Sequence, residues 1–87
     1  DTAVPLVYAC MDLARKINAV RHGGRPRMWP QHRAQAIGAA ARRLSASAAA
    51  DLLAAAVDAD RALKTGRGDS ERLLESLALR FTSALRA

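Results

Sequence analysis

Aromatic side chains are nearly absent from this chain, in which one tryptophan, one tyrosine and one phenylalanine make up 3% of the residues. Hydrophobic residues still account for 51% of the sequence, so alanine and leucine must fill any core. Alanine fills space efficiently only where two backbones approach closely, as between helices that lie side by side. The β-branched and aromatic residues that strands favour are scarce. The composition therefore predicts an all-α protein.

The length of 87 residues suffices for one small domain with a modest core. The sequence opens at Asp1 rather than at a methionine, and we expect it to be a fragment of a longer protein. Cys10 is the only cysteine, so no disulfide can form within the chain, as suits a reducing compartment. No apolar run approaches the roughly 20 residues that a membrane helix needs, and no signal peptide is visible. These features together predict a cytoplasmic protein.

Apolar residues recur at helical spacing in four segments. The first helix is predicted over residues 4–20, where Pro5 suits the first turn and Gly23 and Gly24 follow the end. Its predicted core stripe consists of Leu6, Cys10, Leu13, Ile17 and Val20, widened by Val7, Met11 and Ala14. The second helix is predicted over residues 30–44, with a narrow stripe of Ile37, Ala40, Ala41 and Leu44.

The third helix is predicted from an N-cap at Ser45 to about residue 65, followed by Gly66. Asp60 and Lys64 are spaced for an ion pair across one turn of it. The fourth helix follows a cap at Asp69 or Ser70. We expect both helices to pack through Leu52, Leu63, Leu74, Leu77 and Phe81, in the core or against a partner. The sequence thus predicts a small antiparallel bundle of four main helices.

Residues that could carry chemistry are few and scattered. The two histidines, His22 and His32, lack carboxylate or thiolate partners at the spacing of a metal site. Cys10 falls on the apolar stripe, which is typical of a structural thiol. Residues 65–70 (TGRGDS) lack the ending of a phosphate-binding loop, and their Arg-Gly-Asp is better explained as a turn between two helices. We therefore expect no catalytic site, no metal, no cofactor and no small-molecule ligand.

Positive charge is concentrated in one part of the chain. The sequence has 14 Lys and Arg residues against 8 acids, a formal charge of +6. Residues 15–43 contain eight of these cations and no acid, whereas residues 44–87 are balanced. Within this region, Trp29 lies in a loop with Arg25 and Arg27 and is followed by Arg33. Such residues could stack on a base and hold phosphates, or the tryptophan could simply cover one end of the bundle.

Four segments follow one another along the chain: residues 28–30 (MWP), 42–45 (RRLS), 58–64 (DADRALK) and 72–77 (RLLESL). Their order and spacing resemble those of the C-terminal domain of the bacterial clamp-loader delta subunit, a component of DNA polymerase III. The resemblance covers residues 27–81, about two-thirds of the chain, and rests on the ordered set rather than on any single segment. Residues 3–24 also look like the helix that precedes this region in the family.

The resemblance implies a role in assembly. Delta resembles an AAA+ protein without a working ATP site, and its third domain joins those of the gamma/tau and delta-prime subunits in a circular helical collar. By this resemblance, residues 1–87 would be a truncated form of that oligomerisation domain, bacterial and replisome-associated. It also implies that Trp29 faces the primer-template junction, with Arg25, Arg27 and Arg33 near phosphate.

Two other functions stay open. A free-standing helical domain could bind DNA through the basic region of residues 15–43, and its affinity would fall steeply with salt. A generic adaptor domain is the second alternative, in which case the resemblance would reflect helical composition alone.

Overall fold

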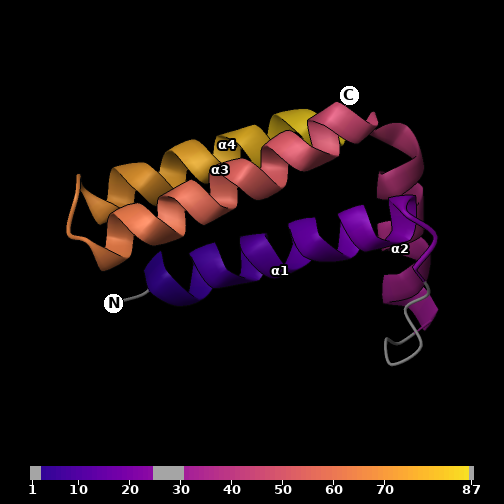
Figure 1. Ribbon diagram of the computed structural model, residues 1–87, viewed down its shortest axis with the longest axis horizontal. Coiled ribbons are helices and arrows are strands. Elements are labelled where there is room, and N and C mark those ends of the chain that lie inside the picture. Colours follow the sequence, from indigo (N-terminus) through magenta and orange to yellow (C-terminus); the bar gives the residue numbers. More distant parts are fainter. Residues whose placement is uncertain (1–2, 25–30, 87) are drawn as a thin grey trace.

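The computed structural model describes residues 3–24 and 31–86, with the side chain of Arg33 left out (Figure 1). Four helices make up most of this part of the chain: α1 (Ala3–Arg21), α2 (Gln31–Arg43), α3 (Ala46–Lys64) and α4 (Ser70–Arg86). The described residues contain no strand. The all-α prediction is therefore confirmed. The first three helices begin and end within two residues of the positions expected from the sequence, and α4 begins at the expected cap.

Three of the helices lie side by side, and α3 runs in the opposite direction to α1 and α4 (Figure 1). The remaining helix, α2, lies across the C-terminal end of α1 instead of alongside it (Figure 1). Its apolar stripe is narrow: among its described side chains only Ala40 and Ala41, near its own C-terminus, are buried, next to the buried Leu44. A helix that is anchored at one end has no long apolar face with which to join a bundle.

Polar caps set the helix ends of the C-terminal half. The Ser45 hydroxyl accepts a hydrogen bond from the backbone N–H of Ala48 at 3.0 Å, which starts α3 as predicted. At the start of α4, Asp69 Oδ1 accepts from the N–H of Glu71 at 2.9 Å. Of the two caps considered for α4, the structure thus uses Asp69. Gly66, at a φ of 69°, adopts the left-handed conformation that follows many helix ends.

One core joins the helices, and alanine contributes nearly half of it. It consists of Val7, Met11, Ala14, Ile17, Ala40, Ala41, Leu44, Ala49, Leu52, Ala56, Ala59, Leu77 and Phe81. Ala14, Ala49 and Ala56 are fully buried. The most extensive helix–helix contact is between α1 and α3. There, Asn18 Nδ2 donates to the carbonyl oxygen of Ala49 at 2.9 Å, so a short side chain of α1 reaches the backbone of α3.

The buried face of α1 differs from the predicted stripe. Its centre is formed by Val7, Met11 and Ala14, which the sequence had placed at the edge. Leu6, placed in the stripe, is 50% exposed. The buried face is therefore rotated from the predicted one, and it combines Ala3 and Ala14 with Val7, Met11 and Ile17. Leucine is displaced to the flanks, where Leu13 lies beside α2.

We expect enlargement of a buried alanine of α3 to destabilise the fold. Ala56→Leu should lower the free energy of unfolding by about 1–3 kcal/mol, because the close contact leaves no room for a longer side chain. Ala50→Leu, at an exposed position of the same helix, should change it by less than about 0.5 kcal/mol. Urea denaturation monitored by circular dichroism measures both, and equal effects of the two substitutions would contradict this packing.

Candidate interaction surface

The residues predicted to contact DNA lie mostly outside the described part of the chain. This is true of Trp29, Arg25 and Arg27, and although Arg33 belongs to α2 its side chain is also outside that part. The structure therefore neither brings these four side chains together nor separates them. Their contact with DNA stays a prediction.

The other cations of the basic region divide into two groups. Arg21 Nη1 donates to the carbonyl oxygen of Ala41 at 2.8 Å and also to that of Leu44. Lys16 forms an ion pair with Asp12 at 2.8 Å. Arg15, Arg42 and Arg43 are exposed. The basic region is thus partly structural, because Arg21 satisfies carbonyl groups at the C-terminal end of α2 that have no partner within that helix.

Loss of the Arg21 guanidinium should weaken the contact between the C-terminal ends of α1 and α2. Arg21→Ala should lower the free energy of unfolding by about 1–2 kcal/mol, since two hydrogen bonds from a charged donor are lost at a partly solvated site. Arg15→Ala, an exposed arginine of the same helix, is the matched control and should change it by less than about 0.5 kcal/mol. Thermal unfolding measures both variants. Equal midpoint temperatures for Arg21→Ala and Arg15→Ala would show that the Arg21 hydrogen bonds do not stabilise the fold.

The five residues predicted for core or partner packing lie in the core or against it. Leu52, Leu77 and Phe81 are 3–5% exposed. Leu63 and Leu74 are partly buried and pack against the same cluster. In the single chain, all five side chains therefore pack within the fold, and Leu63 and Leu74 remain partly exposed.

Large apolar side chains are exposed on the first two turns of α1. Val4 is 49% exposed, Leu6 50% and Tyr8 59%. Residues 3–11 (AVPLVYACM) contain no charged or polar side chain apart from the tyrosine hydroxyl and the cysteine thiol. A helix that is apolar on all sides is typical of a buried environment. The unbroken apolar run could have revealed this surface from the sequence, but it was interpreted only as a core stripe.

A second feature is an open groove between α3 and α4. Its larger part has a volume of about 1090 Å³ and is lined by Ala48, Asp51, Leu52, Arg72, Glu75, Ser76, Leu79, Arg80, Ser83 and Ala84. It continues into a smaller part of about 450 Å³ that shares Asp51, Ser76 and Arg80. Leu79 is 62% exposed. Among the residues of α1 that the structure describes, none lines either part.

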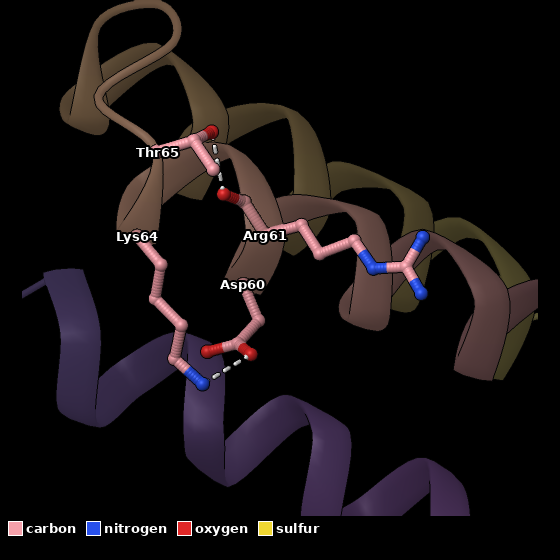
Figure 2. A network of polar contacts seen from close by, with 4 residues as sticks. All are labelled: Asp60, Arg61, Lys64 and Thr65. Atoms are coloured by element: carbon pink, nitrogen blue, oxygen red, sulfur yellow. Dashed lines mark hydrogen bonds and ion pairs between the residues drawn. The ribbon is translucent and has the colours of Figure 1, made fainter.

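The end of α3 uses its polar residues locally. Figure 2 shows the predicted ion pair between Asp60 and Lys64, which spans 2.9 Å and lies toward α1, while the Arg61 side chain points in a different direction, along α3. Thr65 Oγ1 donates to the carbonyl oxygen of Arg61 at 2.8 Å (Figure 2). Arg67 Nε donates to Thr65 Oγ1 at 3.3 Å. Together with the Asp69 cap, these bonds give the TGRGDS segment a role in joining α3 to α4.

Groups that could support chemistry are dispersed in the described residues. No three His, Cys, Asp or Glu side chains of residues 3–24 and 31–86 gather to hold a metal ion. Burial raises the pKa of the Cys10 thiol, so its reactive thiolate is less populated than in a solvated cysteine. His22 and His32 are exposed. In the same part of the chain, no helix combines the length and the apolar character needed to cross a membrane.

Comparison with protein-family models, with curated proteins and with solved structures gives no match to this sequence. The function is therefore inferred from the surfaces described above.

Proposed function

We propose that this chain is a non-catalytic assembly domain whose partner covers the exposed apolar turns at the start of α1. The observation that carries the proposal is the exposure of Val4, Leu6 and Tyr8 within a stretch that has no charged residue. Fully burying a large apolar side chain gains about 1.5–3 kcal/mol relative to leaving it exposed. Covering three that are half-exposed therefore supplies a substantial part of the free energy of association.

The partners that the sequence favours are clamp-loader subunits. By its resemblance to the delta subunit, the chain would be the third, helical domain of that protein and a C-terminal fragment of a longer AAA+-type subunit. It would hold delta in the pentameric collar with gamma/tau and delta-prime while the sliding clamp is loaded on primed DNA. On this proposal the chain would act in the bacterial cytoplasm, with the replisome, and would have no ATP site of its own.

Residues 28–30 lie outside the described part of the chain, and two of the other segments behind the resemblance lie at helix ends. In the RRLS segment, Leu44 is buried between α2 and α3 and Ser45 caps α3. In the DADRALK segment, Asp60 and Lys64 form an ion pair at the end of α3. Leu44 and Ser45 lie at the turn from α2 to α3, and the ion pair lies at the C-terminal end of α3. A helical domain of this shape needs both features. They support the proposed architecture, whereas the apolar start of α1 supports the assembly role.

Sedimentation of the chain with the collar domains of gamma/tau and delta-prime from the same organism tests the proposal. We expect a heavier species of defined stoichiometry that contains this chain. Tyr8→Glu should weaken its formation about tenfold or more, because a charge then enters an apolar contact. Ala19→Glu, at an exposed position near the other end of α1, should leave it unchanged.

Absence of a mixed species at micromolar concentration, with the chain folded by circular dichroism, would contradict the proposal. The alternative is a DNA-binding domain that uses residues 15–43, favoured by the exposure of Arg15, Arg42 and Arg43. If the chain alone then bound duplex DNA with an affinity that falls steeply with salt, this alternative would replace the assembly role.

A further inference from the structure

Short side chains from both helices form a large part of the lining of the groove between α3 and α4. On the α3 side, Ala48, Ala54, Ala55 and Ala62 line it, and on the α4 side Ser76, Ser83 and Ala84 do. The buried Leu52 and Leu77 also line the groove. The result is a long hollow with a partly apolar floor and a large exposed side chain, Leu79, at its edge.

The two walls of the groove carry different charges. The α3 wall is acidic, with Asp51 and Asp58. The α4 wall carries Arg72 and Arg80, with Glu75 between them. Asp51 and Arg80 each line both parts of the groove, so both lie where the two parts meet. In the described part of the chain no ion pair joins these two residues to each other or to a third.

We propose that the partner of this groove is a second copy of the chain, bound face to face about a two-fold axis that runs along the groove. A rotation about that axis places α3 of each copy over α4 of the other and preserves position along the groove. Asp51 of one copy then faces Arg80 of the other, and the symmetry generates the same pair twice. The four helices form a bundle in which Leu79 of each copy is covered by the short side chains of the opposite α3.

The charges select this axis over the other face-to-face choice. A two-fold axis perpendicular to the groove would lay α3 against α3, which brings Asp51 and Asp58 toward their own copies. Like charges directly opposed across an interface are destabilising. Glu75 lowers the net positive charge of the α4 wall, so the attraction rests mainly on Asp51 and Arg80, and it should weaken as salt rises.

Sedimentation equilibrium of the chain alone tests this pairing. The unaltered chain should dimerise at micromolar concentration. Arg80→Glu should raise the dissociation constant about tenfold or more, since each of the two symmetric pairs becomes a repulsion. Arg61→Glu makes the same change on α3 outside the groove, and it should have little effect. Combining Asp51→Arg with Arg80→Glu reverses both charges and should restore much of the affinity.

Three results would overturn the proposal: a monomer at all concentrations tested, a dimer equally sensitive to Arg80→Glu and Arg61→Glu, or a double variant no better than Arg80→Glu. Circular dichroism of each variant confirms that it is folded. The groove contains no described residue of α1, so Tyr8→Glu should not alter the dimer. Failure here therefore leaves the proposed collar contact standing, and failure of the collar contact leaves the dimer standing.

Discussion

The close contact between α1 and α3 is the constraint on which the rest of the structure depends. Ala14, Ala49 and Ala56 are fully buried, and Asn18 hydrogen-bonds the backbone of the facing helix. Nearly without aromatic side chains, the chain cannot fill a wide interior, and it gains cohesion by bringing backbones together. The other helices are placed relative to this pair: α4 packs against both, and α2 is held across the end of α1, where Arg21 of α1 binds carbonyl groups at its C-terminus.

The same use of small residues has an opposite consequence on the other side of α3. Where α3 faces α4, alanine and serine leave a groove instead of a tight contact. Some large apolar side chains are not enclosed by this core and remain on the surface, at the start of α1 and at Leu79. These two exposed regions are the surfaces that we propose for unlike partners and for a second copy.

Helix positions could be predicted from the sequence because their signals are local. Ser45, Gly66 and Asp69 act on neighbouring backbone groups, and the Asp60–Lys64 pair needs only one helical turn. The buried face of α1 could not be predicted in the same way, because the choice between its leucine and alanine sides depends on how closely α3 approaches. The α3–α4 groove likewise depends on which helices pair. Trp29 lies outside the described residues, so its predicted contact with DNA stays a prediction from the sequence.

Native-state amide hydrogen exchange is the most direct test of the α1–α3 contact as the foundation of the fold. Amides that exchange only on global unfolding identify the most stable part of a domain. The account predicts that the slowest amides lie in the middle of α1 and α3, around Ala14, Ala49 and Ala56, and that α2 exchanges faster. Slowest exchange in α2 or α4, or uniform protection across the helices, would contradict it.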